Sequence, residues 1–162
     1  WLSRHAESED QLEGILGSHR RELTKNGRQY CKELQGFLRR CKREMEEAGE
    51  EEGSEILVLM GTAPVHYSTL QGMLKGSAAN LAAASPLDEE MPGAGSKEFS
   101  AMSTSLLNEL DGGICNGLSY DEIKRDFPDL WAERERDKLH FRYPNGESYQ
   151  DVIGRLRPII IE

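Results

Sequence analysis

The residues with the clearest chemical potential stand near the start of the chain, in the run Arg4-His5-Ala6-Glu7-Ser8. The preceding Trp1-Leu2-Ser3 predicts the end of a buried strand, and open α/β sheets bind ligands at the carboxyl ends of their strands. A neutral imidazole there could attack phosphorus and form a covalent phosphohistidine. The adjacent guanidinium could hold a phosphate or carboxylate by two hydrogen bonds. An Arg-His pair alone is more often structural, so the rest of the chain has to decide between the two interpretations.

Charge is unevenly distributed along the chain. The 162 residues carry 20 Lys and Arg against 29 Asp and Glu, for a formal net charge of −9. Ten of the acidic residues lie in 44–55 and 88–90, and the remainder sums to +1. Residues 19–43 are basic, but no aromatic residues are interleaved in a binding motif, so a solvated helix face is the better interpretation. We therefore predict neither a nucleic-acid partner nor an anionic membrane partner.

Cysteine usage and hydropathy limit the class of protein further. No stretch approaches the roughly 18–20 apolar residues of a membrane span. Cys31, Cys41 and Cys115 lack CxxC spacing, which favours free thiols in a reducing compartment over disulfides or a zinc site. We predict a cytoplasmic protein without a metal site. Because the chain begins with Trp1 and ends on the apolar run 159–161, we expect it to be a C-terminally truncated piece of a longer protein.

The elements that must position Arg4 and His5 can be predicted from periodicity. Thr24 is a suitable helix N-cap, and apolar residues then recur at helical spacing as far as Met45. The Glu- and Gly-rich run 46–55 predicts an acidic loop. The apolar run Ile56–Met60 predicts a central parallel strand, and a short helix over 65–74 follows it. These elements indicate an α/β layered domain.

The second half contains a break in composition and then three more predicted helices. Residues 75–105 are rich in Ala, Ser and Gly, and we interpret them as a long insertion within a single domain that spans 1–162. Ser119 to Glu122 reads as a capping box that opens a helix closed by Pro128. Helices are also predicted over 130–139 and from Ser148 to Leu156.

Several motifs together resemble the histidine phosphatase, or phosphoglycerate-mutase-like, superfamily. Residues 4–8 are similar to its Arg-His-Gly-Glu-Ser signature. Residues 107–113 resemble the Leu-Asn-Glu-Ile-Asp-Ala-Gly segment of its fructose-2,6-bisphosphatase branch, found in 6-phosphofructo-2-kinase/fructose-2,6-bisphosphatases. Residues 119–128 and 141–149 resemble the Thr-Tyr-Glu-Glu-Ile and Arg-Tyr-Pro-Lys-Gly-Glu-Ser-Tyr segments of that branch. The resemblance is loose over 1–74 and close over 106–162, and it implies a three-layer α/β fold.

The resemblance also implies roles for individual residues. His5 would be the nucleophile, Arg4 would hold the transferred phosphate, and Glu109 would be the general acid. Asp111 and the glycines after it would shape the loop. The remaining candidates would bind the substrate: Tyr120, Arg142, Tyr149, Asn145 and His66. No cofactor is implied for the phosphatase step, whereas ATP and magnesium would serve a kinase domain if one precedes residue 1.

Some positions depart from the family pattern. Ala6 replaces a Gly, Gln11 and Ile15 stand where phosphate-contacting Asn and Arg occur, and His66 replaces a phosphate-clamping Arg. A histidine is charged only part of the time near neutrality and cannot bind a phosphate by a bidentate fork. His140 and Asn145 likewise stand where the family carries Arg and Lys. Other basic residues could compensate: Arg20, Arg21 and Lys75.

These observations lead to one main expectation and two alternatives. The main expectation is hydrolysis of the 2-phosphate of fructose 2,6-bisphosphate to fructose 6-phosphate, in a bifunctional protein that controls glycolysis. The first alternative is a catalytically degenerate domain that binds a sugar phosphate or a kinase domain without turnover. The second is a relative acting on another phosphate ester, such as a phosphoglycerate. The oligomeric state stays open.

Overall fold

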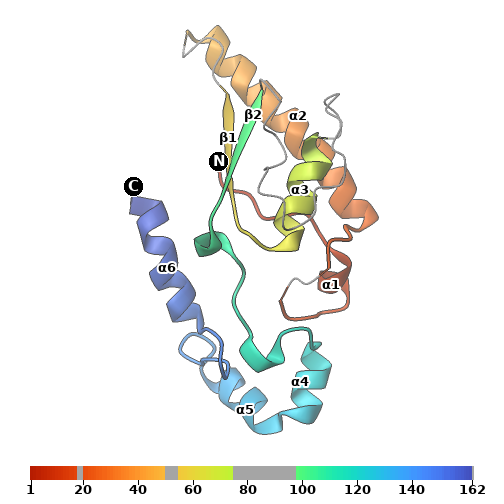
Figure 1. Ribbon diagram of the computed structural model, residues 1–162, viewed down its shortest axis with the longest axis vertical. Coiled ribbons are helices and arrows are strands. Elements are labelled where there is room, and N and C mark those ends of the chain that lie inside the picture. Colours follow the sequence, from red (N-terminus) through yellow and green to blue (C-terminus); the bar gives the residue numbers. More distant parts are fainter. Residues whose placement is uncertain (18–19, 50–54, 75–97, 162) are drawn as a thin grey trace.

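The computed structural model describes residues 1–17, 20–49, 55–74 and 98–161. The helices and strands follow one another along the chain as shown in Figure 1. Their bounds are α1 Glu9–Leu12, α2 Lys25–Glu47, β1 Ile56–Met60, α3 Pro64–Leu74, β2 Phe99–Ser103, α4 Tyr120–Asp126, α5 Pro128–Arg136 and α6 Tyr149–Ile161, with 3-10 turns η1 Ser105–Leu107 and η2 Gly113–Cys115.

The sheet consists of β1 and β2, which run parallel in a register that pairs Ile56 with Phe99 and Met60 with Ser103. The strand predicted from the apolar run Ile56–Met60 is therefore confirmed. The predicted insertion at 75–105 extends too far, because Phe99–Ser103 is a strand and Phe99 is only 1% exposed in the core. Residues 75–97 of that segment lie outside the described part of the chain.

Helices α2 and α3 pack against each other and cover one face of the sheet. The Thr24 hydroxyl accepts a hydrogen bond from the Gly27 N–H at 2.9 Å, so the predicted N-cap of the long helix is confirmed. The helix continues two residues into the predicted acidic loop and ends at Glu47. The core beneath these helices is formed by their apolar faces and the inward side chains of the strands: Cys31, Met60, Val65, Leu70, Met73, Leu74 and Phe99.

The opposite face of the sheet is open among the described residues. Leu57, Leu59 and Met102 are 59%, 46% and 57% exposed. Alternation of side chains along a strand explains this pattern, since Val58 between the two leucines turns toward the helices. Of the three predicted layers, the part of the chain that the structure describes contains the sheet and one helix layer, and its α/β class is as predicted.

Helices α4 and α5 lie at the far end of the molecule from the sheet, and α6 runs back along the side (Figure 1). The predicted capping box is present: the Ser119 hydroxyl accepts from Glu122 N–H, and the Glu122 carboxylate accepts from Ser119 N–H at 2.8 Å. Pro128 ends α4 and begins α5, whose last helical residue is Arg136 rather than the predicted Leu139. This end of the molecule has a second hydrophobic core, which is built around Leu16, Cys115, Ile123 and Tyr143.

The segment before His5 differs from expectation. Trp1–Ser3 form no strand, and Trp1 and Leu2 are 76% and 99% exposed. Instead, residues 4–8 rest on the first turn of α2, where Glu7 O accepts from Thr24 N–H at 3.0 Å and Glu7 Oε1 accepts from the Thr24 hydroxyl at 2.5 Å. The Ala6 N–H also donates to the Thr69 hydroxyl of α3 at 2.9 Å, so α2 and α3, rather than a strand of the described sheet, position His5. The three cysteines are free, and no described helix meets the length and hydropathy needed to cross a membrane.

The packing of this segment on α2 yields a test with a matched control. A methyl group on Gly27 would collide with the Glu7 carbonyl, which is backbone and cannot turn aside. We expect Gly27→Ala to lower the free energy of unfolding by about 1–3 kcal/mol, as overpacking does. Gly36 lies on the same helix, and among the described residues a Cβ there would meet only Arg40 Nη1, at 3.8 Å. Gly36→Ala should therefore raise the free energy of unfolding by about 0.5–1 kcal/mol. Urea unfolding of both variants measures the difference, and equal effects would contradict this packing.

Candidate active site

His5 and Glu109, which are 104 residues apart in sequence, form the centre of the candidate site. His5 Nε2 lies 2.5 Å from Glu109 Oε1, and the His5 side chain is only 4% exposed. His5 Nδ1 lies 2.9 Å from the Ala6 carbonyl oxygen. Because a carbonyl only accepts, this contact assigns an N–H to Nδ1 and leaves Nε2 to share a proton with the carboxylate of Glu109.

Two more of the predicted residues lie beside this pair. Arg4 Nη2 is 3.9 Å from Glu109 Oε1, and its side chain is 75% exposed. The His66 ring, from α3, stands edge-on to the His5 ring with 5.5 Å between their centroids. The structure thus brings together Arg4, His5, His66 and Glu109 from three separate parts of the chain.

The electrostatics of the cluster favour a charged Glu109 and a neutral His66. The hydrogen bond from His5 lowers the pKa of Glu109 against the effect of its burial, and the nearby charges of His5 and Arg4 lower it further. Burial lowers the pKa of His66, and the nearby His5 adds to this effect. His66 Nδ1 is buried without a hydrogen-bond partner among the described residues. This nitrogen faces the backbone of Gly61, so the His66 ring is packed between Gly61 and His5 in the free protein.

The loop that carries Glu109 is tied to the end of β1 by a residue that the sequence analysis did not single out. The Asn108 side chain accepts from Thr62 N–H at 2.6 Å and donates to the Thr62 hydroxyl at 2.8 Å. Gly61 makes this approach possible, because a Cβ there would collide with both His66 and Asn108. The only sequence signal for Asn108 was its place in the family-like segment 107–113.

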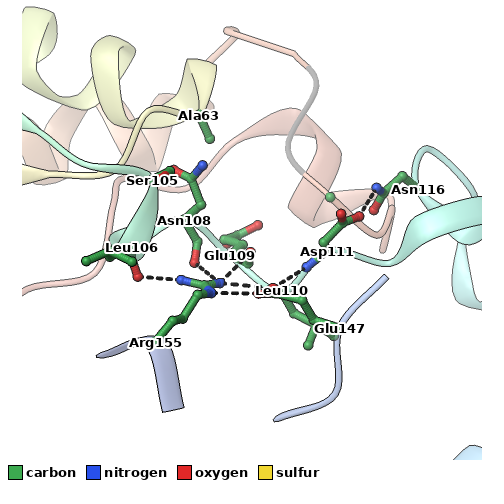
Figure 2. Close-up of a pocket in the computed structure, with 11 residues that line it drawn as sticks. Ala63, Ser105, Leu106, Asn108, Glu109, Leu110, Asp111, Asn116, Glu147 and Arg155 are labelled. Carbon is green, nitrogen blue, oxygen red and sulfur yellow. Dashed lines mark hydrogen bonds and ion pairs between the residues drawn. The ribbon is translucent and has the colours of Figure 1, made fainter. Parts of the chain in front are cut away.

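A cavity of about 480 Å³ opens beside Glu109 (Figure 2). Its charged lining consists of Glu109, Asp111, Glu147 and Arg155. Asp111 shapes the loop as predicted, since its Oδ1 accepts from Gly113 N–H at 2.8 Å and from Asn116 Nδ2 at 2.6 Å. The neutral lining residues are Gly17, Ala63, Ser105, Leu106, Asn108, Leu110 and Asn116.

Of the cluster around His5, only Glu109 lines this cavity; Arg4, His5 and His66 do not. The other four predicted substrate residues also lie outside its lining and make contacts elsewhere. The Tyr120 ring lies under the Arg134 guanidinium, 5.1 Å from centroid to Cζ, and packs edge-on to Trp131. Arg142 forms an ion pair with Asp151 at 2.5 Å. Asn145 occupies a left-handed turn at φ 60°, and Tyr149 begins α6 with 44% exposure.

The positions that depart from the family pattern have structural roles here. Gln11 accepts a hydrogen bond from Ser8 N–H at 3.3 Å, and Ile15 forms an antiparallel bridge with Ser119. Arg20 was a candidate to compensate for lost phosphate contacts, but it is paired with Asp10 at 3.1 Å and with Glu13 at 3.0 Å. Lys75 lies outside the described residues. Within the described ranges, no group of three His, Cys, Asp or Glu side chains is arranged to hold a metal ion.

Comparisons with known proteins agree with the predicted fold and family. Residues 93–162 match the model of the histidine phosphatase superfamily (branch 1). The α-ribazole phosphatase of Shigella flexneri superposes with a TM-score of 0.68 at 20% identity, over 99% of this chain and 64% of that one. The chain therefore carries a histidine phosphatase superfamily domain with the phosphoglycerate-mutase-like fold.

The relatives that align with this chain over its whole length carry the names of the branch predicted from the sequence motifs, the fructose-2,6-bisphosphatases. A 6-phosphofructo-2-kinase/fructose-2,6-bisphosphatase of Arabidopsis thaliana is 34% identical over 99% of this chain and 17% of its own length. A fructose-2,6-bisphosphatase of Saccharomyces cerevisiae is 31% identical over 100% of this chain and 28% of its own. The chain thus spans less than a third of each of these relatives.

Proposed function

We propose that this chain hydrolyses the 2-phosphate of fructose 2,6-bisphosphate through a phosphohistidine on His5. The observation that carries the proposal is the 2.5 Å contact between His5 Nε2 and Glu109 Oε1. It joins a buried imidazole to a carboxylate, the nucleophile and acid that cleavage of a phosphate ester by a histidine needs. The names of the relatives motivate the choice of substrate.

The first half of the reaction uses the proton that Nε2 and Glu109 share in the free protein. An incoming phosphoryl group displaces the carboxyl of Glu109 from Nε2, and the proton leaves with Glu109. The Nε2 lone pair then attacks phosphorus while the bond from phosphorus to the sugar oxygen breaks, and Glu109 gives its proton to that oxygen. The contact from Nδ1 to Ala6 O holds the ring in the required tautomer.

The second half releases phosphate and restores the site. Glu109, now a carboxylate, takes a proton from a water molecule that attacks the phosphohistidine. The bond from phosphorus to Nε2 breaks, inorganic phosphate leaves, and Glu109 again shares its proton with His5. Arg4 would neutralise charge on the transferred phosphoryl oxygens, and His66 would offer them a hydrogen bond.

The rest of the substrate and the context of the domain complete the proposal. The fructose 6-phosphate portion would be bound by Tyr120, Arg142, Asn145 and Tyr149. Arg142 would have to exchange its ion pair with Asp151 for the sugar phosphate. We further propose a kinase domain in the same protein, using ATP and magnesium, and a cytoplasmic location. The phosphatase reaction as written needs no cofactor.

One observation favours the alternative of a degenerate domain that binds without turnover. The charged lining of the cavity is mostly acidic, and its single guanidinium, that of Arg155, already bonds Glu147 and backbone carbonyls. An anionic substrate would therefore depend on Arg4 and on residues that make other contacts in the free protein. Loss of one charge-assisted hydrogen bond costs roughly 1.5–3 kcal/mol, so several losses would weaken phosphate binding severely.

A substrate panel distinguishes these functions. The full chain is incubated with fructose 2,6-bisphosphate and, separately, with 2- and 3-phosphoglycerate, while released phosphate is measured and binding is followed by calorimetry. We expect phosphate and fructose 6-phosphate in equal amounts from the bisphosphate and slower release from the phosphoglycerates. Binding without release would support the degenerate domain, and a faster phosphoglycerate reaction would replace the proposed substrate.

A further inference from the structure

Arg155, on α6, reaches across to the loop that carries Glu109 (Figure 2). Its guanidinium donates to the carbonyl oxygens of Leu106, Asn108 and Glu109, the last two at 2.7 and 3.1 Å. It also forms a two-pronged pair with Glu147, from Nε to Oε1 at 2.8 Å and from Nη2 to Oε2 at 3.1 Å. One side chain, 16% exposed, thus satisfies three backbone carbonyls and a carboxylate.

Glu147 extends the same clamp to the other side of Glu109. Its Oε2 accepts from Asp111 N–H at 3.0 Å, and its own N–H donates to Asp111 O at 2.8 Å. Arg155 therefore fixes the loop up to Glu109, and Glu147 fixes it immediately after. Among the described residues, neither Arg155 nor Glu147 has a hydrogen bond or ion pair with His5. Their link to the His5–Glu109 pair runs through the backbone of the loop that carries Glu109.

We propose that Arg155 is a positioning residue that sets Glu109 at hydrogen-bond distance from His5, and this role in the reaction rests on the proposed function. Proton transfer depends steeply on geometry, and a displacement of about 1 Å can cost 100-fold in rate. A guanidinium has five donors in a planar fork, which lets it hold several carbonyls at once, whereas an ammonium is a compact point charge. With a shorter side chain at position 155, the carbonyls of the loop would lose their donor, turn toward water and so move the loop.

Two substrates with different leaving groups distinguish a misplaced Glu109 from a general loss of structure in an Arg155 variant. A sugar alkoxide needs a proton from Glu109, whereas p-nitrophenolate leaves without one. We expect Arg155→Gln in the full chain to slow release of fructose 6-phosphate by roughly 10- to 100-fold, within the range for a misplaced general acid. Formation of the phosphoenzyme from p-nitrophenyl phosphate, which needs no proton from Glu109, should change by less than about threefold. Arg155→Lys should recover only part of the sugar phosphate rate. Arg157→Gln, an exposed arginine on the same helix, is the matched control and should behave as wild type.

A second measurement tests the inference without any turnover. The ¹⁵N resonance of His5 Nε2 reports its bond to Glu109, and Glu109→Gln gives the reference for an altered bond. We expect Arg155→Gln to shift this resonance toward the reference, Glu147→Gln to shift it less, and Arg157→Gln to leave it unchanged. If wild type hydrolyses neither substrate, the proposed function fails, while the resonance still supports or overturns the positioning role. An equal loss in the rate of phosphoenzyme formation with both substrates, or an unshifted His5 resonance in folded Arg155→Gln, would overturn the positioning role.

Discussion

His5→Ala is expected to abolish the covalent phosphoenzyme and to lower the turnover of fructose 2,6-bisphosphate by roughly 10³-fold or more, the scale seen when a catalytic nucleophile is removed. The reason is that no other described side chain lies where it could accept the phosphoryl group from the same direction. His66 is close, at 5.5 Å between centroids, but its ring is perpendicular to that of His5. Quenching the full chain in base after mixing with substrate labelled at the 2-phosphate should trap labelled wild-type protein and unlabelled His5→Ala.

The stability of the label to base and its loss in acid identify a phosphohistidine rather than a phosphoserine. Gln29→Ala is the control, because Gln29 is an exposed residue of α2 that bonds Glu33 and has no assigned role in substrate binding. Label that persists in His5→Ala would move the nucleophile to another residue. Absence of label in wild type, together with absence of product, would favour the binding-only alternative.

Glu109→Gln is the second change with a large expected effect. The glutamine keeps the size and one acceptor of the carboxyl group, but it cannot release or accept a proton. We expect the release of fructose 6-phosphate to fall by about 10²- to 10⁴-fold, the usual contribution of a general acid. Hydrolysis of p-nitrophenyl phosphate should fall much less in its first step, because that leaving group needs no proton. Rapid-quench measurement of phosphoenzyme formation with both substrates separates the two steps.

The same variant should also change the pH dependence of stability. The pKa of Glu109 is lowered in the folded protein, chiefly by its hydrogen bond with His5. A lowered carboxyl pKa stabilises the fold above the unfolded pKa, and this contribution is lost as the pH falls through the folded pKa. Unfolding of Glu109→Gln followed from neutral pH into the acid range should therefore lose less stability than wild type. A steeper loss of stability in acid for the variant than for wild type would contradict the pairing of Glu109 with His5. An equal decrease in phosphoenzyme formation with both substrates would contradict its role as general acid.

Local elements of the fold were predictable because their causes lie within a few residues. Thr24 caps α2 through Gly27, three positions later, and Ser119 and Glu122 cap each other in the same way. The errors fell on elements without such local signals. Trp1–Ser3 offered two apolar residues and no turn signal. The strand Phe99–Ser103, with the sequence FSAMS, lacks strict alternation of apolar and polar residues and lies beside a low-complexity segment. Its strand character comes from parallel pairing with Ile56–Met60, a partner more than forty positions away.

The residues of the candidate site also fall into those that the sequence indicated and those that only the structure shows. Resemblance to a family selected His5, Arg4, His66 and Glu109, and the structure brings these four together. It leaves Tyr120, Arg142, Asn145 and Tyr149 in contacts of their own. Asn108, Glu147 and Arg155 received no role from the sequence, although they hold the loop of Glu109 in place.

The sequence alone determined the chemical groups, the helix caps and the family pattern, because these depend on residue types and short spacings. Only the tertiary structure decided how Glu109 reaches His5 across 104 residues and how Arg155 supports it from α6. Arg155 binds mainly to backbone carbonyls, which every residue carries alike. No pattern of side chains along the chain can therefore reveal such a clamp, and it emerges only when packing brings the helix to the loop.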